Sequence, residues 1–188
     1  MQEGNTDVMK KKLAAVLALV MMLLISGCHK ATLENYKLYR STPLGFSIEY
    51  PDFWEKSTNV GEGIAAFITP AEGYSDEYNE SLSVQRFVLD MEGDDAFNSY
   101  VKGYVAKLEN TLKNYSLVSE QDTTLGGEAA YQIVYESVSD DETSQMRFLQ
   151  LFAEHNGKVY VVSYIAEFGS YTYFLTYVDQ MLSTFQFI

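Results

Sequence analysis

The stretch of the chain that most constrains its fold is MRFLQLFAEHNGKVYVVSYIAE, residues 146–167. Asn156 and Gly157 lie at its centre, and both residue types tolerate the positive φ angles of a two-residue β-hairpin turn. The two arms are apolar on both of their faces: Phe148 and Phe152 against Leu149 and Leu151, then Tyr160 and Val162 against Val161 and Ile165. Since a strand that is apolar on both faces is covered on both sides, the sequence predicts a layered structure with this hairpin in its middle.

Four further strands are predicted around the hairpin. In GFSIEYP, residues 45–51, apolar and polar side chains alternate with the period of a half-buried strand, and Pro51 ends the run. The other three predicted strands are residues 63–69, 81–89 and 129–138. The polar segments between them are expected to be loops, including the acidic hairpin tip that contains SDDE, residues 139–142.

Two amphipathic helices complete the pattern. The first follows Asp94 and Asp95, which suit a helix N-terminus as capping residues and as partners of the helix dipole. Its apolar stripe is Phe97, Tyr100, Val101, Tyr104, Val105, Leu108 and Leu112. The second starts at Gly169-Ser170, and its stripe is Tyr171, Phe174, Leu175, Val178, Met181, Leu182 and Phe185. The order strands, helix, strands, helix with hairpin links predicts an α+β fold, an antiparallel β-sheet flanked by helices.

The first thirty residues have the features of an export signal. Lys10, Lys11 and Lys12 precede an uncharged run, Leu13–Ile25, which is shorter than the roughly 20 residues that a membrane-spanning helix needs. The run ends in ISGC, residues 25–28, which resembles the lipobox of bacterial lipoproteins. That resemblance implies cleavage between Gly27 and Cys28 and acylation of Cys28. An uncleaved anchor, or a secreted protein with a stray cysteine, is the alternative.

These features give an expected domain organisation. Residues 1–27 are a lipoprotein signal peptide, residues 28–43 a lipidated tether, and residues 44–188 the folded domain. The membrane lipid around the acylated Cys28 is then the first expected partner, and the protein is expected on the extracytoplasmic face of a cell membrane. Because Cys28 is the only cysteine, no thiol would remain for a disulfide, a metal or a nucleophile.

The charge of the chain argues against a nucleic-acid partner. The net charge is −13, and it becomes −14 once residues 1–27, which carry a net +1, are removed. Such an acidic surface repels phosphate backbones. Its simplest role is to keep the domain soluble.

Three motifs are similar to those of the PsbP-like family. They are GFSIEYPDFWE at residues 45–55, LGGEAAYQIVYE at residues 125–136, and a last helix that ends in STFQF at residues 183–187. The resemblance covers residues 44–187 and implies an α/β/α sandwich around an antiparallel sheet. The family includes an extrinsic subunit of photosystem II, cyanobacterial lipoproteins and a nuclear factor that acts on the Ran GTPase. The resemblance therefore implies docking onto a larger protein partner without chemistry, and no binding residue is carried over from it.

No catalytic or metal-binding motif is found in the sequence. The two histidines, His29 and His155, belong to no G-x-S-x-G, H-E-x-x-H, P-loop or G-x-G-x-x-G pattern. The segment DMEGDD, Asp90–Asp95, has its glycine at the fourth position instead of the sixth position of a calcium loop. We therefore expect no cofactor and no enzymatic activity. A carboxylate-dependent envelope hydrolase and a calcium or small-ligand binding lipoprotein are the alternative hypotheses.

The loop EGYSDEYNE, residues 72–80, is the candidate partner surface. Tyr74 and Tyr78 lie in it, and aromatic side chains on loops can serve as contact anchors for a protein partner. An ordinary polar surface loop is the alternative interpretation.

Overall fold

The computed structural model describes residues 35–57, 63–71, 78–93, 95–139 and 142–188. Residues 1–34 lie outside this part of the chain, and with them the predicted signal peptide, its cleavage site and Cys28. Tyr36–Ile188 forms one compact unit. Among the described residues, no helix combines the length and the apolar composition needed to cross a bilayer.

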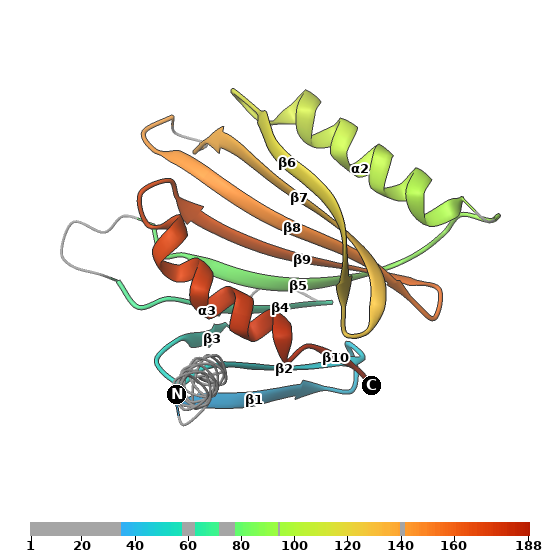
Figure 1. Cartoon of the computed structure of the whole chain (residues 1–188), viewed down its shortest axis with the longest axis horizontal. Coiled ribbons are helices and arrows are strands. Elements are labelled where there is room, and N and C mark those ends of the chain that lie inside the picture. The colour runs from blue at the N-terminus through green and yellow to red at the C-terminus, as the bar shows by residue number, and fades with distance from the viewer. Residues whose placement is uncertain (1–34, 58–62, 72–77, 94, 140–141) are drawn as a thin grey trace, which may run out of the picture. The chain divides into compact units, whose positions relative to one another are not determined.

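A seven-stranded antiparallel sheet runs through the middle of this unit (Figure 1). Its strands lie side by side in the order β3-β4-β5-β9-β8-β7-β6. Their bounds in that order are Glu55–Ser57, Ile64–Ile68, Ser81–Val88, Lys158–Glu167, Gln145–His155, Glu128–Val138 and Ser116–Leu125. The predicted strands at 63–69, 81–89 and 129–138 are thereby confirmed.

The predicted central hairpin is confirmed as β8 and β9. Asn156 and Gly157 adopt φ angles of 53° and 70° at its turn, as a two-residue hairpin turn requires. Alternate side chains serve different cores: Phe152 and Val161 pack in one, whereas Leu151 and Val162 pack in the other. The apolar composition of both faces thus comes from two cores that share these strands.

A second, smaller sheet and two helices cover the main sheet. The smaller sheet is antiparallel, with the order β1-β2-β10: Tyr36–Ser41, Phe46–Pro51 and Gln186–Phe187. It shares one core with helix α3, Tyr171–Ser183. Helix α2, Ala96–Thr111, packs on the opposite face of the main sheet over the second core (Figure 1). This arrangement confirms the predicted α+β class, although the predicted strand at 45–51 belongs to the smaller sheet.

Both predicted helical stripes are confirmed, but the predicted capping is not. All seven stripe residues of α2 belong to the second core, and all seven of α3 belong to the first. Asp95 occupies the N-cap position of α2 without a side-chain bond to a helix N–H. Its ψ angle of 12° is far from the extended geometry of a capping residue. Its carboxylate instead accepts a hydrogen bond from Asn98 Nδ2 at 2.8 Å, and Asp94 lies outside the described residues.

The predicted boundary between tether and domain at residue 43 is wrong. Tyr36–Ser41 forms β1, which pairs with β2 along its whole length. Tyr39 turns inward from β1 and lies 5.6 Å from Phe46 and 5.4 Å from Phe67 between ring centroids. Because Lys37 and Arg40 flank this inward ring, the segment YKLYRS looks like a polar linker in the sequence. The folded domain begins at Tyr36, and residues 28–34 of the predicted tether lie outside the described residues.

Candidate docking groove between helix α2 and strand β6

Strand β6 is the long, exposed edge of the main sheet. It pairs with β7 on one side, and in the described part of the chain no strand pairs with its other side. Every residue from Ser116 to Asp122 is exposed, and the apolar side chains of Leu117 and Val118 are 41 % and 49 % exposed. A bulge interrupts the register between Leu117 and Ser119. An exposed edge strand offers unpaired N–H and C=O groups to another chain.

A groove of about 410 Å³ lies between this edge and helix α2. Its lining residues are Asn98, Val101, Lys102, Val105, Ala106, Glu109, Glu120 and Tyr131. Val101, Val105 and Ala106 supply an apolar wall from α2, while Glu120 and Tyr131 supply a polar wall from the sheet. The groove can therefore hold an apolar side chain against the helix and polar groups against the strands.

The sequence of β6 explains why the groove stays open. In the register of the sheet, Glu120 and Asp122 stand opposite Ile133 and Tyr131, on the face that α2 covers. Apolar side chains at these two places would continue the second core under the helix. Carboxylates remain in contact with water instead, so the core ends at β7 and the groove begins there.

Glu120 and Tyr131 form the main polar contact of the groove. The Tyr131 hydroxyl donates a hydrogen bond to Glu120 Oε2. This bond, followed by partial burial and by the negative charges of Glu120 and Asp122, raises the pKa of Tyr131 to about 12. The phenol consequently stays protonated at neutral pH and acts as a donor to the carboxylate.

Replacing Glu120 by glutamine is expected to lower the pKa of Tyr131 from about 12 toward the 10 of an unperturbed tyrosine. A neutral amide removes the charge that favours the protonated phenol. The pKa of Tyr131 is higher in the folded state than in the unfolded state. Its contribution to the free energy of unfolding is therefore fully present below about pH 10, and it is lost as the pH rises through about 12. NMR titration of the Tyr131 ring measures the pKa.

Asp122→Asn is the control for this titration, because Asp122 acts on Tyr131 only through its charge. It should lower the pKa by less than Glu120→Gln does. Equal titration curves for wild type and Glu120→Gln would show that the hydrogen bond does not form.

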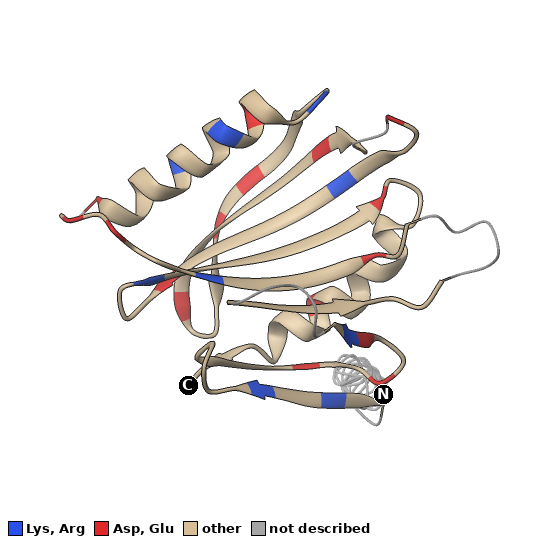
Figure 2. Ribbon diagram, turned by 180° about the vertical axis from the view of Figure 1, so that it is seen from behind, with Lys and Arg blue, Asp and Glu red and all other residues tan. Residues whose placement is uncertain are grey.

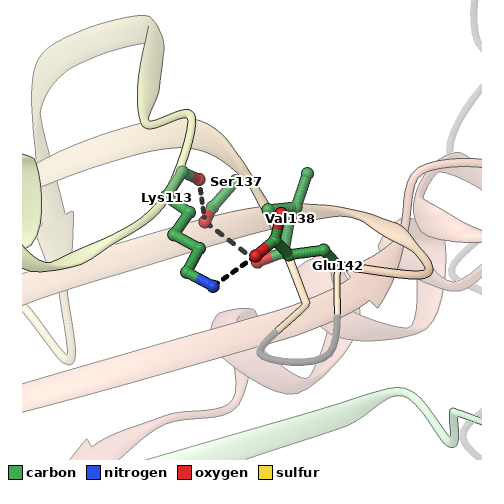
Figure 3. A network of polar contacts seen from close by, with 4 residues as sticks. All are labelled: Lys113, Ser137, Val138 and Glu142. Atoms are coloured by element: carbon green, nitrogen blue, oxygen red, sulfur yellow. Dashed lines mark hydrogen bonds and ion pairs between the residues drawn. The ribbon is translucent and has the colours of Figure 1, made fainter.

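A polar network fixes the far end of α2 against the sheet (Figure 3). The Ser137 hydroxyl lies 2.9 Å from the carbonyl oxygen of Lys113, just beyond the helix, and 3.2 Å from that of Val138. Lys113 Nζ pairs with Glu142, but both side chains are about 60 % exposed, so this ion pair adds little stability. The Ser137 hydroxyl and the Val138 N–H, which donates to the same Lys113 carbonyl oxygen at 3.3 Å, therefore hold the segment after α2 on β7.

The candidate residues of the 72–80 loop do not line this groove. Tyr74 lies outside the described residues. Tyr78 is half-buried, and its hydroxyl lies 3.2 Å from Thr143 Oγ1 in the β7–β8 turn. In the structure Tyr78 thus links two loops.

His155 is held by structural contacts. Its Nδ1 lies 3.0 Å from Glu128 Oε1, and its Nε2 lies 2.8 Å from Asn156 Nδ2. Its ring stacks on Phe187 with centroids 4.4 Å apart. One ring nitrogen is therefore engaged with the start of β7 and the other with the β8–β9 turn. His29 lies outside the described residues.

Within the described ranges, no three His, Cys, Asp or Glu side chains gather in a way that could hold a metal ion. Asp90 and Glu92 of the former calcium-loop candidate are exposed, and Asp94 is outside those ranges.

The groove is the feature that the sequence did not reveal. Its residues come from α2, β6 and β7, so no local motif contains them. One signal was present: Glu120 and Asp122 alternate along an otherwise polar run, as on one face of a strand.

Solved structures of the same fold span most of this chain. The solution structure of cyanobacterial PsbP (CyanoP) from Synechocystis sp. PCC 6803 matches with a TM-score of 0.55 and 16 % identity, covering 87 % of this chain and 98 % of that one. The Ran-binding protein Mog1p of Saccharomyces cerevisiae matches with a TM-score of 0.56 and 12 % identity, covering 81 % of this chain and 95 % of that one. LpqN of Mycobacterium tuberculosis matches with a TM-score of 0.57 and 12 % identity, covering 80 % of this chain and 89 % of that one. At these identities the likeness establishes the fold.

A family model gives the assignment. Among curated proteins, no match to the sequence is found. The model of the PsbP-like proteins matches residues 27–187, which include every strand and helix of the described unit. The chain therefore belongs to the PsbP-like protein family.

Proposed function

We propose that this protein is a lipid-anchored, extracytoplasmic lipoprotein whose PsbP-like domain docks, without catalysing a reaction, onto a protein partner of a membrane or envelope complex. Acylated Cys28 holds the protein on the membrane, and the groove between α2 and β6 receives the partner. Lipobox-like ISGC at residues 25–28 and the basic, apolar segment before it support the anchor.

The observation that carries the docking proposal is a groove with an apolar strip on α2, beside a strand edge that pairs with no other strand in the described part of the chain. An extended peptide can add to such an edge through main-chain hydrogen bonds while its side chains enter neighbouring pockets. Here Leu117 and Val118 flank the edge, and Val101, Val105 and Ala106 form the adjacent wall. An extended segment of a protein fits both features at once.

Relatives of the same fold support an accessory role. The solved structures include a Ran-binding protein and a protein involved in cell envelope biogenesis. The groove does contain two carboxylates, those of Glu109 and Glu120, as a hydrolase would require. However, both side chains are exposed, and Glu120 is engaged by Tyr131. Docking therefore accounts for the groove better than hydrolysis does.

Ala106→Trp is the variant that tests this proposal, because it places a large ring at the exposed rim of the groove. The lipidated full-length protein is crosslinked in its native membrane, purified and analysed by quantitative mass spectrometry. Wild type should recover a defined partner, and Ala106→Trp should reduce that recovery about tenfold, the equivalent of about 1.4 kcal/mol.

Gly103→Trp is the matched control. Gly103 lies on the same helix and is not among the groove residues, and a Cβ atom added there would meet no atom within 4 Å. Recovery should stay at the wild-type level. Equal recovery with Ala106→Trp would move the docking site away from the groove, and recovery of no partner by wild type would refute the docking function.

A further inference from the structure

An aromatic surface lies on the opposite side of the main sheet from the groove. It consists of Tyr36, Leu38, Phe53, Tyr173 and Tyr177, contributed by β1, the β2–β3 turn and α3. Leu38, Phe53 and Tyr173 are 66 %, 45 % and 62 % exposed. Three large apolar side chains exposed on adjoining elements indicate a contact with something other than water.

Contacts between neighbouring side chains make this surface continuous. The rings of Phe53 and Tyr177 meet edge to face with centroids 5.4 Å apart, and Tyr173 lies 6.3 Å from Tyr177. Tyr36 and Tyr177 both pack against the first core, and burial, followed by the Tyr177 phenol, raises the pKa of Tyr36. Leu38 shares the face of β1 with Tyr36, because residues two apart in a strand point the same way. The small sheet and α3 therefore present one surface.

This surface contains the point at which the chain enters the domain. Tyr36 is the first residue of β1 and lies eight residues after Cys28. A fully extended chain spans at most about 3.6 Å per residue, so the acylated residue is within about 29 Å of Tyr36. On the proposed function, on which this inference rests, the tether to the bilayer thus joins the domain at this surface.

The distribution of charge favours the same orientation. In residues 28–57 the basic Lys30, Lys37, Arg40 and Lys56 balance four acidic residues, whereas residues 58–188 contain twenty acidic and six basic residues, a net charge of −14. Figure 2 shows basic segments on β1 and acidic segments along the main sheet and its loops. The elements that carry the aromatic surface are neutral as a group, because Lys37 and Arg40 of β1 offset Asp52 and Asp179. An anionic membrane surface therefore repels the rest of the domain more than it repels this surface.

We infer that the aromatic surface rests on the bilayer, with Tyr36, Phe53, Tyr173 and Tyr177 in the headgroup region. Tyrosine suits this region because its ring is apolar and its hydroxyl is polar. Helix α2 lies across the main sheet from α3 and the smaller sheet (Figure 1), so the groove that α2 lines faces away from the membrane toward a partner. The bilayer therefore sets the orientation of the docking site.

Site-directed fluorescence in vesicles tests this orientation. Tyr173→Cys carries a polarity-sensitive dye on the aromatic surface, and Asn110→Cys carries it on the exposed side of α2. The full-length lipoprotein is reconstituted into vesicles of phosphatidylethanolamine and phosphatidylglycerol with or without a phospholipid that bears a quencher near its headgroup. We expect severalfold stronger quenching at residue 173 than at residue 110, together with a blue shift at residue 173 alone.

The outcomes separate this inference from the anchor. Protein that floats with the vesicles but is quenched equally at both positions overturns the orientation and leaves the anchor intact. If the wild-type protein does not float with the vesicles and its Cys28 accepts the dye, both the orientation and the anchor are overturned. The dye at residue 173 could instead show a blue shift in detergent at high protein concentration, without quenching by lipid. That result would assign the surface to contact with a second copy of the protein and would also overturn the inference.

Discussion

Cys28→Ser is expected to abolish lipid attachment and to leave the precursor uncut. A serine hydroxyl lacks the nucleophilic thiolate on which acyl attachment depends, and without acyl chains the main contribution to membrane binding is lost. Metabolic labelling with a clickable fatty acid should show label in wild type and only background in the variant. Intact mass spectrometry should show loss of residues 1–27 in wild type alone.

Gly27→Ala is the control for this experiment, because alanine also fits the small-residue position of a lipobox. It should be labelled and cleaved like wild type. Label that persists in Cys28→Ser, or a wild-type protein that keeps residues 1–27, would contradict the anchor and leave the domain without its proposed attachment.

Phe152→Ala is expected to lower the free energy of unfolding by about 3–5 kcal/mol, the usual cost of removing a buried phenylalanine ring. Phe152 is fully buried, and its ring meets that of Tyr104 of α2 edge to face at 5.1 Å. The change removes the contact that ties the helix to the centre of the sheet. Thermal unfolding of the full chain in mild detergent, followed by circular dichroism, should show a Tm about 10 °C lower.

Phe168→Ala is the matched control for this loss. Phe168 is 47 % exposed, and its principal partner is Arg147, whose guanidinium lies 4.5 Å from the ring centroid. An exposed cation–π contact contributes about 0.5–1 kcal/mol, so the Tm should fall by only a few degrees. Equal shifts for the two variants would mean that α2 is not packed on the sheet through Phe152.

The sequence predicts those elements that bury a distinct pattern of side chains. Strands β8 and β9 are recognisable because their alternate residues, such as Leu151 and Phe152, serve two separate cores. Both helices are recognisable from their apolar stripes. Strand β6 escapes prediction because its first seven residues are all exposed, so burial imposes no period on it. Strand β1 escapes because only Tyr36 and Tyr39 of its six residues pack against the core, and basic residues separate them from the rest of the strand and from each other.

The candidate site is less predictable than the fold for a related reason. A groove is space that side chains do not fill, and here it arises because Glu120 stands where an apolar residue would complete the core under α2. Its position depends on which strand lies at the edge of the sheet. The strand order places β6 there, and neither spacing nor composition determines that order in advance.

If Cys28 holds the protein on a membrane as proposed, the acidic edge of β6 has a further consequence. Molecules held on a surface meet far more often than the same molecules in solution, and bare strand edges tend to join when they meet. Two β6 edges would bring the carboxylates of Glu120 and Asp122 toward their counterparts, and the bulge at Leu117–Ser119 would disturb the register. The same acids would attract a strand with basic side chains. On the proposed membrane, these charges and the bulge would therefore keep copies of this protein apart while leaving the edge open to a positively charged partner.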